Sequence, residues 1–185
     1  MVKRSYKLLA KRLWWDLKDS TIRKSYKYYL IARIPGFFGI MIREDFWCNK
    51  LKRCGKNLII KEGVTIYDVE QISIGDSVSI GINCVLEGKG KITIGSNVLI
   101  GPQTTIFSTN HIFEDNDRPI KTQGLTLKEV IIGNDVWIGS KAFIMPGANI
   151  EDSCVISAGS VVGGRRYIKG SILAGNPARV IGHRN

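Results

Sequence analysis

The sequence of 185 residues lacks a long hydrophobic run. Its most apolar stretch, residues 28–42, contains Arg33 and Pro35 and is too short to span a bilayer. Residues 1–19 are amphipathic, without the basic start and continuous apolar run of a signal peptide. We therefore expect a cytoplasmic protein with neither a membrane span nor a secretion signal.

Cysteine is scarce as well. The four residues, Cys48, Cys54, Cys84 and Cys154, have no Cys-x-x-Cys spacing, and the last three fall at positions that the repeat described below places in the interior. The sequence therefore predicts buried thiols in a reducing compartment.

Acidic residues are nearly missing from the N-terminal part of the chain. Residues 1–53 hold 14 Lys or Arg against 4 Asp or Glu, a net charge of +10, whereas residues 54–185 hold 13 against 12, a net charge of +1. A nucleic-acid surface spread over the fold would need cations throughout the chain. The charge distribution therefore argues against nucleic acid as a partner.

A six-residue period runs through most of the chain, and such a period is typical of a parallel β-helix. From Cys54 onward an aliphatic residue recurs in steps of six, unbroken from Ile132 to Val180, and sixteen of the eighteen marked positions are Ile, Leu or Val. Glycine often follows the marked residue, where we expect a corner with unusual backbone angles. The period predicts about six stacked triangular coils, with two-residue insertions before Ile74 and Ile94. The marked positions are 54, 60, 66, 74, 80, 86, 94, 100, 106, 132, 138, 144, 150, 156, 162, 168, 174 and 180.

Two segments depart from this period. Residues 107–131 must leave the solenoid as one long loop, and a long loop on a rigid scaffold is usually functional. Residues 1–53 carry leucines at helical spacing, such as Leu9 and Leu13, with lysines on another stripe. This pattern predicts a basic amphipathic helical extension.

Two motifs resemble the hexapeptide-repeat acyltransferases, above all the galactoside, maltose and surface-polysaccharide O-acetyltransferases. They are IGNDVWIGSKAFIMPGANI at residues 132–150 and AGNPARV at residues 174–180, and with the repeats the resemblance covers residues 54–182. The resemblance implies an all-β domain folded as a left-handed parallel β-helix. It also implies a homotrimer with active sites between subunits, acetyl-CoA as co-substrate and no metal.

The resemblance makes His111, at the opening of the long loop, the general base. An alcohol has too high a pKa to attack a thioester unaided, whereas a neutral imidazole accepts its proton as the bond forms, so no acyl-enzyme is required. The chain has only one other histidine, His183, which lies in the C-terminal tail and is expected to have no role. The alternative is that His111 is a loop histidine without a task.

By the same resemblance, the backbone N–H of Ser140 stabilises the developing oxyanion, and Trp137 lines that cleft or covers the edge of a coil. Asn83 is expected to hold the acceptor. Gly81 stands where the family has a further asparagine, and Asn83 has the alternative of capping a turn.

The cofactor is expected in a groove between coils. The phosphates would meet the basic residues Arg165, Arg166 and Arg179, because guanidinium groups bind phosphate in a forked geometry. The family often has Thr-Lys where this chain has glycines 163–164, and a solvated basic turn is the alternative. The groove itself would be lined by Trp137, Gly139, Ser140, Ala158 and Gly159.

We therefore expect an enzyme that transfers acetyl from acetyl-CoA to a sugar hydroxyl of a surface polysaccharide or lipid-linked glycan. The basic stripe beside Trp14 and Trp15 suits an anionic surface, so residues 1–50 are expected to contact the inner face of the membrane. The alternative is a helical cap that shields the first coil.

Three other functions compete with this prediction. An antibiotic-modifying acetyltransferase shares the repeats, the loop histidine and the co-substrate, but the basic extension favours a membrane-associated glycan. A carbonic anhydrase on this solenoid would need three zinc-binding histidines, and the chain has two. A non-catalytic scaffold would not require a histidine at the mouth of the loop.

Overall fold

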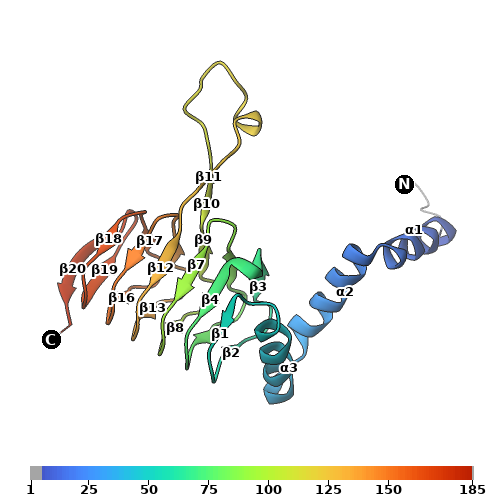
Figure 1. The fold of residues 1–185 in the computed structure, drawn as a ribbon, viewed down its shortest axis with the longest axis horizontal. Coiled ribbons are helices and arrows are strands. Elements are labelled where there is room, and N and C mark those ends of the chain that lie inside the picture. The colour runs from blue at the N-terminus through green and yellow to red at the C-terminus, as the bar shows by residue number, and fades with distance from the viewer. Residues whose placement is uncertain (1–5, 185) are drawn as a thin grey trace.

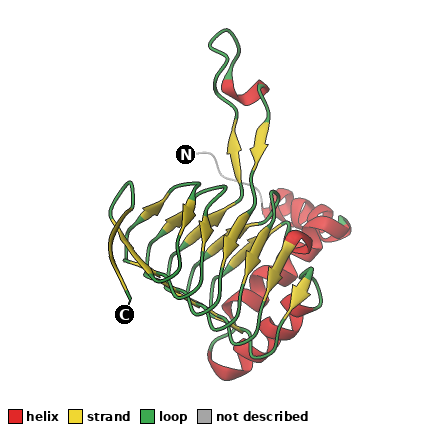
Figure 2. Cartoon of the chain, turned by 60° about the vertical axis from the view of Figure 1, so that its left-hand side comes forward, coloured by secondary structure: helices red, strands yellow, loops and turns green. Residues whose placement is uncertain are grey.

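A triangular stack of short strands forms the body of the chain, with helices at its N-terminal end and an arm projecting from one edge (Figure 1). The computed structural model describes residues 6–184, so residues 1–5 of the predicted extension lie outside the described range. Figure 2 shows the strands lining up on the sides of the stack. We name the three sides sheets A, B and C.

The strands of each sheet come from successive coils. Sheet A contains β1 (Arg53–Cys54), β4 (Ile72–Ile74), β7 (Ile92–Ile94), β12 (Val130–Ile132), β15 (Asn149–Ile150) and β18 (Arg166–Tyr167). Sheet B contains β2 (Ile59–Ile60), β5 (Ser79–Ile80), β8 (Leu99–Ile100), β13 (Trp137–Ile138), β16 (Val155–Ile156), β19 (Ser171–Ala174) and β20 (Arg179–His183). Sheet C contains β3 (Thr65–Tyr67), β6 (Val85–Glu87), β9 (Thr105–Phe107), β14 (Phe143–Ile144) and β17 (Val161–Val162).

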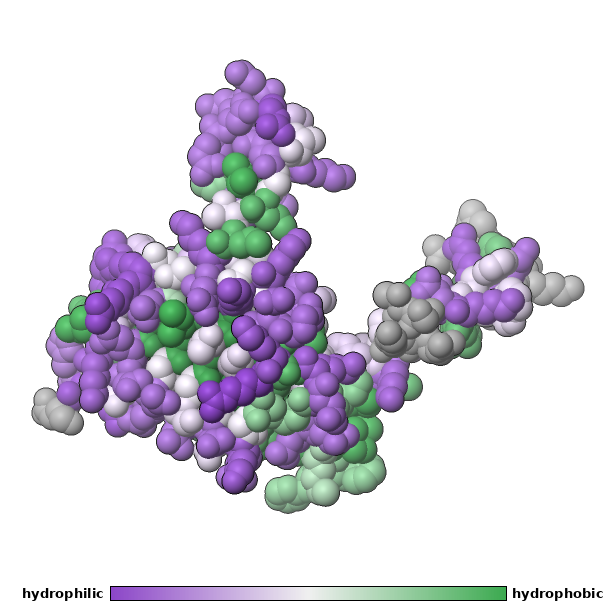
Figure 3. Space-filling model, viewed as in Figure 1, coloured by the Kyte–Doolittle hydropathy of each residue, from purple (hydrophilic) through white to green (hydrophobic). Residues whose placement is uncertain are grey.

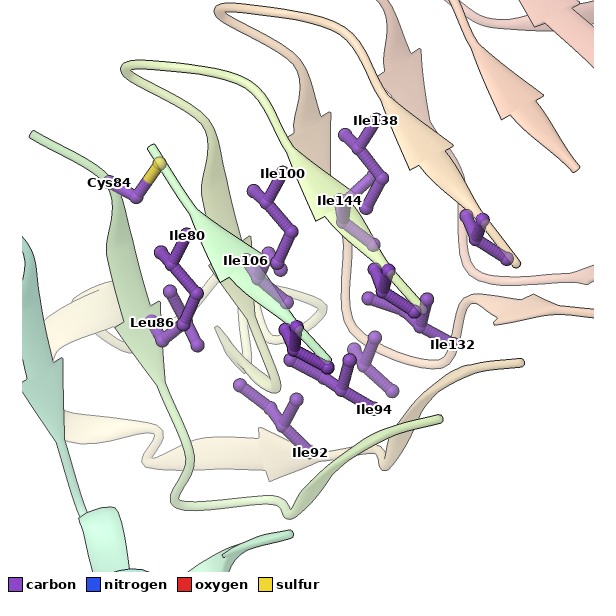
Figure 4. Packing of buried hydrophobic residues seen from close by; sticks show 14 of the residues in the cluster. Ile80, Cys84, Leu86, Ile92, Ile94, Ile100, Ile106, Ile132, Ile138 and Ile144 are labelled. Carbon is purple, nitrogen blue, oxygen red and sulfur yellow. The ribbon is translucent and has the colours of Figure 1, made fainter. Parts of the chain in front are cut away.

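The marked aliphatic residues point inward and stack on one another from coil to coil (Figure 4). In sheet B, Ile60 pairs with Ile80, Ile80 with Ile100, and the series continues through Ile138 to Ile156. Paired strands lie about 4.8 Å apart, so each buried side chain contacts its counterpart above and below. One hydrophobic core therefore runs along the solenoid. The six strands of sheet A confirm the prediction of about six coils.

The glycines that follow the marked residues have a different role from the one predicted. Gly139 has an ordinary backbone conformation, and the left-handed residue of its corner is Lys141, with φ of 59°. A Cβ atom on Gly139 would lie 2.5 Å from the backbone nitrogen of Ala158 in the next coil. Glycine is therefore required by the close approach of stacked corners.

The steps of six end before residue 180. Tyr167, rather than Ile168, pairs with Ile150, because it follows Val162 by five residues instead of six. The exposed fraction is accordingly 3% for Tyr167 and 58% for Ile168.

The last two marked positions are wrong as well. The one-residue shift persists into β19, so Leu173 takes the inward position expected of Ala174. Val180 is exposed, because β20 runs antiparallel to β19 instead of completing another coil.

The cysteine prediction is half correct. Cys84 and Cys154 are buried free thiols, and burial raises the pKa of both. Cys48 and Cys54 instead form a disulfide with a Cα–Cα distance of 5.1 Å. The turn between the last helix and β1 brings these two residues together, which their spacing in the sequence does not reveal.

The predicted loop is an arm of residues 108–129, since residues 107, 130 and 131 remain in the strands of the solenoid. The arm is an antiparallel ribbon of β10 (Thr109–His111) and β11 (Leu125–Leu127), with a short 3₁₀ helix, η2 (Ile120–Thr122), near its tip. A second such helix, η1 (Val69–Gln71), occupies the insertion before Ile74.

Three helices precede the solenoid: α1 (Tyr6–Lys18), α2 (Ser20–Arg33) and α3 (Gly36–Cys48). Helix α1 extends away from the body, whereas α3 lies across the first coil (Figure 1). Trp47 and Leu51 join the hydrophobic core, and Ala32 accepts a hydrogen bond from Gly63 through its carbonyl. The end of α2 and all of α3 thus cap the first coil.

Arg43 holds this cap in place from a fully buried position. Its Nε donates to the carbonyl of Ile60 at 2.7 Å, and its Nη1 donates to the carbonyl of Ile34 at 2.5 Å. Its Nη2 has no hydrogen bond within residues 6–184 but lies 3.5 Å from Glu62 Oε1. One guanidinium therefore joins the helices to the first coil.

We predict that Arg43→Ala lowers the free energy of unfolding by about 3 kcal/mol, because it leaves buried carbonyls without donors and removes a partner of Glu62. Urea denaturation followed by circular dichroism measures the change. Arg53 is exposed, so Arg53→Ala is the control. Its free energy of unfolding should stay within about 0.5 kcal/mol of the wild-type value. Equal stability of the two variants would contradict this role of Arg43.

Candidate active site

His111 lies at the end of β10, on the first leg of the arm. Its side chain lines a pocket of about 300 Å³ between the arm and the corner that joins sheets C and A in later coils. The residues around the pocket are Asn110, His111, Phe113, Glu114, Thr126, Lys128, Met145, Pro146 and Gly164. The imidazole therefore stands at the junction of the arm and the solenoid.

A polar network fixes the base of the arm. The hydroxyl of Ser108 is buried, donates to the carbonyl of Glu87 at 2.6 Å and accepts from the backbone N–H of Gly90 at 2.8 Å. Thr109 donates from Oγ1 to Glu87 Oε2 at 2.7 Å. Ser108 and Thr109 precede His111 by three and two residues. Their hydrogen bonds therefore limit how far the backbone of His111 moves relative to the coils.

The returning leg of the arm contributes residues that the sequence analysis missed. Thr126 pairs with Asn110 across the ribbon, and Lys128 follows β11. Glu114, just beyond β10, places a carboxylate in the wall of the pocket and accepts from the N–H of Phe113 at 3.1 Å. Antiparallel pairing within the loop is the signal that would have found Thr126.

A second cavity, a groove of about 440 Å³, lies at the corner between sheets B and C. It is lined by Gly101, Pro102, Trp137, Gly139, Ser140, Val155, Ile156, Ser157 and Ala158. The groove brings together four predicted site residues, of which Trp137 is exposed on the outer side of β13. Gly159 follows Ala158 at the same corner, with φ of 70°.

The backbone N–H of Ser140 has no acceptor among the residues that the structure describes. The backbone N–H groups on either side already have acceptors, because Gly139 donates to the carbonyl of Ile156 at 2.7 Å and Lys141 donates to the carbonyl of Pro102 at 2.9 Å. A free amide in the wall of a groove can donate to an oxygen that gains negative charge during a reaction.

Two of the three predicted phosphate-binding arginines converge. Arg165 Nη2 and Arg179 Nη1 both donate to the carbonyl of Ala178, at 3.4 and 3.3 Å. Arg166 turns away and forms an ion pair with Glu151, whose pKa it lowers. The predicted set therefore divides into a convergent pair and one arginine that already has a carboxylate partner.

Asn83 lies in an earlier coil than the groove, at the same corner between sheets B and C. It is exposed, has φ of 56° and donates its backbone N–H to the carbonyl of Glu62 at 2.9 Å. His183, in β20, pairs with Ser171 and lines neither the His111 pocket nor the groove.

A single chain does not bring all of these groups together. His111 lies at the corner between sheets C and A, whereas Ser140 and Asn83 lie at the corner between sheets B and C. The whole width of sheet C separates the two corners. His111 of one copy can meet Ser140 of another only if the two copies pack side by side.

The comparisons with known proteins agree with this fold. The family described as bacterial transferase hexapeptide (six repeats) matches residues 129–164. Nodulation protein L of Rhizobium meliloti is 42% identical over 180 residues, which cover 95% of this chain and 86% of the relative. WcaF of Escherichia coli, whose name proposes a colanic acid biosynthesis acetyltransferase, is 29% identical over 180 residues, with coverage of 94% and 86%. Two other curated relatives are longer, and the chain spans 65% and 67% of their lengths.

A solved structure extends the comparison to three dimensions. A galactoside acetyltransferase in complex with coenzyme A has a TM-score of 0.77 and 27% identity, covering 100% of this chain and 86% of that chain. This chain therefore belongs to the hexapeptide-repeat acetyltransferases and has their left-handed parallel β-helix fold.

Proposed function

We propose that this acetyltransferase moves acetyl from acetyl-CoA to a sugar hydroxyl of a surface polysaccharide or lipid-linked glycan. The observation that carries the proposal is the position of His111, in a pocket between the arm and the solenoid. The relative named for colanic acid biosynthesis and the solved galactoside acetyltransferase support a glycan acceptor. The alternative is an antibiotic-modifying acetyltransferase.

His111 acts as the general base in this proposal. Its neutral imidazole accepts the proton of the acceptor hydroxyl while the oxygen attacks the acetyl carbonyl, and the imidazolium then returns the proton to the departing thiolate. Ser140 donates its free N–H to the carbonyl oxygen as negative charge develops there. The acetyl group passes directly to the sugar, so this chain needs no nucleophile of its own.

The groove at the corner between sheets B and C suits the pantetheine arm of the co-substrate. Gly139 lets the two coils approach closely at this corner, since a Cβ atom there would collide with the next coil, and Trp137 and Ala158 line the groove. Arg165 and Arg179 offer two guanidinium groups for phosphates. When bound, acetyl-CoA supplies the activated acyl thioester, and we assign acceptor contact to Asn83.

We further propose a homotrimer in which the later strands of sheet C, β9 and β14, face a common threefold axis, whereas β3 beside the cap lies outside this contact. This arrangement would set the corner that carries His111 beside the neighbour's corner that carries Ser140. The outer face of sheet C supports it, because Phe107 and Phe143 lie there, half-buried and 5.6 Å apart between ring centroids. Apolar residues of this kind are typical of subunit interfaces.

The N-terminal segment is proposed to contact the inner face of an anionic membrane. No helix within residues 6–184 is both long and apolar enough to cross a bilayer. Surface contact fits better, because Leu13 and Trp14 are exposed on α1, and Phe37 and Phe38 are 89% and 67% exposed on α3. These apolar groups accompany the net charge of +10 on residues 1–53.

We predict that His111→Ala lowers acetyl transfer from acetyl-CoA by about two to four orders of magnitude, the usual contribution of a general base. Acetyl-CoA binding should change little, because the proposed role is to remove a proton from the acceptor. Release of free thiol measures turnover, and isothermal titration measures binding. His183→Ala is the matched control and should behave as wild type. Retention of more than about a tenth of wild-type turnover in His111→Ala would disprove the role of His111 as general base.

We predict that Phe143→Glu produces a folded monomer without transferase activity, because it puts a charge into the proposed interface. Light scattering should give a mass near three times the 20.6 kDa chain for wild type and near 20.6 kDa for the variant. Ile131→Glu, on the outer face of sheet A, is the control and should remain trimeric. An active wild-type monomer would contradict the shared site.

We predict that removing residues 1–19 reduces binding to vesicles containing phosphatidylglycerol, since the deletion takes away α1 with its apolar stripe and several cations. Vesicle sedimentation measures the bound fraction. Pure phosphatidylcholine vesicles are the control, because they lack the anionic attraction. If the truncated protein sediments with anionic vesicles as wild type does, the segment serves only as a cap.

A further inference from the structure

A cavity of about 790 Å³ lies between α2, α3 and β3, apart from the two cavities already described. It opens on the outer side of the first coil, beside the cap. Its lining consists of Ser25, Tyr26, Tyr28, Tyr29, Phe46, Trp47, Lys50, Thr65, Ile66 and Tyr67. Six of these ten residues are aromatic, and a cavity of this size and lining is typical of a binding site for an apolar small molecule.

The floor of the cavity is rigid. The ring of Tyr28 lies 4.9 Å from that of Trp47, and the ring of Phe46 lies 5.1 Å from that of Trp47, both in edge-to-face geometry. Trp47 belongs to the hydrophobic core of the solenoid, and the other two rings pack against it. The space is therefore a preformed feature of the cap.

Several hydroxyls in the lining already have partners within the protein. Tyr28 donates to the carbonyl of Val64, Ser25 to the carbonyl of Ile22, and Tyr26 to the carboxylate of Asp16. The described residues of the lining include no Asp, Glu, Asn or Gln, whose oxygens would accept hydrogen bonds from sugar hydroxyls. The cavity thus presents mainly carbon surface, which favours a hydrocarbon chain over a glycan.

The charged group of the lining is a cation. Lys50 is exposed, and its Nζ lies 4.8 Å from the centroid of the Phe46 ring, at one side of the cavity. Among the lining residues that the structure describes, no carboxylate competes for it. A ligand with a hydrocarbon chain and an anionic group, such as a phosphate, matches this combination of an apolar lining and an exposed cation.

The cavity and the arm share one edge of the solenoid. Tyr67, in the cavity wall, pairs with Glu87, and Glu87 pairs with Phe107, the last residue before the arm. Two strand spacings of about 4.8 Å separate these coils, a span of roughly 10 Å. A molecule held in the cavity by its chain can therefore extend its polar end towards the arm.

We propose that this cavity binds the hydrocarbon chain of an anionic lipid-linked acceptor, with Lys50 meeting its phosphate. The inference rests on the proposed function and narrows its substrate class, from glycans in general to glycans carried on a lipid phosphate. The cavity thereby holds the acceptor at a site separate from the acetyl-transfer chemistry.

Fluorescence of Trp47 tests the proposal directly. The chain has four tryptophans, and Trp14→Phe, Trp15→Phe and Trp137→Phe together leave Trp47 as the reporter in the cavity wall. Decyl phosphate brominated along its chain should quench this signal saturably, because bromine quenches indole on contact. Inorganic phosphate should not quench it. Absence of saturable quenching by the alkyl phosphate would overturn the proposal.

Substitutions in the same background identify the binding place. Ser25→Phe fills the cavity and should weaken alkyl phosphate binding at least about tenfold, since each methylene excluded from it forfeits a factor of roughly 4 in affinity. The matched control, Lys27→Phe on α2 outside the lining, should stay within about twofold. Equal affinity of the two variants would overturn the site.

Light scattering tests whether the cavity is occupied by a lipid or by a second copy of the chain. The assembly mass of Ser25→Phe should equal that of wild type, and a loss of mass would assign the cavity to a subunit contact and overturn the proposal. Quenching requires no acetyl-CoA. Failure of the acetyl-transfer function therefore appears in the thiol-release assay, whereas failure of the lipid site appears in the quenching.

Discussion

The stacking of aliphatic side chains in register, one coil above the next, is the constraint on which the rest of the structure depends. Each inward residue of sheet B contacts its counterpart in the coils on either side, as Ile80 does with Ile60 and Ile100. A one-residue change in the length of a coil moves an aliphatic residue from the core to the surface, as happens to Ile168. The lengths of the coils therefore set the positions of the corners, and the corners carry the candidate site residues.

Two of the three kinds of corner carry the candidate site residues, and these two differ in structure. The corners between sheets B and C are narrow, because Gly139 and its counterparts let the coils approach closely, and they form a groove with the free N–H of Ser140. The corner between sheets C and A is where the chain departs to form the arm, with Ser108 and Glu87 holding its base. The coils thus support one long projection, which is hydrophilic at its tip and carries apolar residues nearer its base (Figure 3). His111 lies on its first leg.

Most of the fold could be predicted from the sequence, because inward residues repeat at a fixed interval and burial enforces that interval. The period identified the coils, the departure of the arm and the position of His111. It did not reveal the five-residue step after Val162, where a buried tyrosine replaces an aliphatic residue, or the disulfide of Cys48, which depends on how the cap folds back. Glu114 and Thr126 were missed because ribbon pairing within the arm leaves no periodic signal. The aromatic cavity joins residues of the helices and of β3, so no local pattern in the chain announces it.

The reversed strand β20 has a consequence for how molecules of this protein meet. A stack of parallel coils is open at both ends, and unpaired strand edges recruit further strands, in the limit producing fibres. At the N-terminal end, Arg43 and the helices occupy the face of the first coil. At the other end, β20 runs antiparallel to β19. Its free edge therefore cannot pair in parallel with the first coil of another copy. Edge-to-edge pairing of copies through sheet B is thereby disfavoured at both ends of the stack.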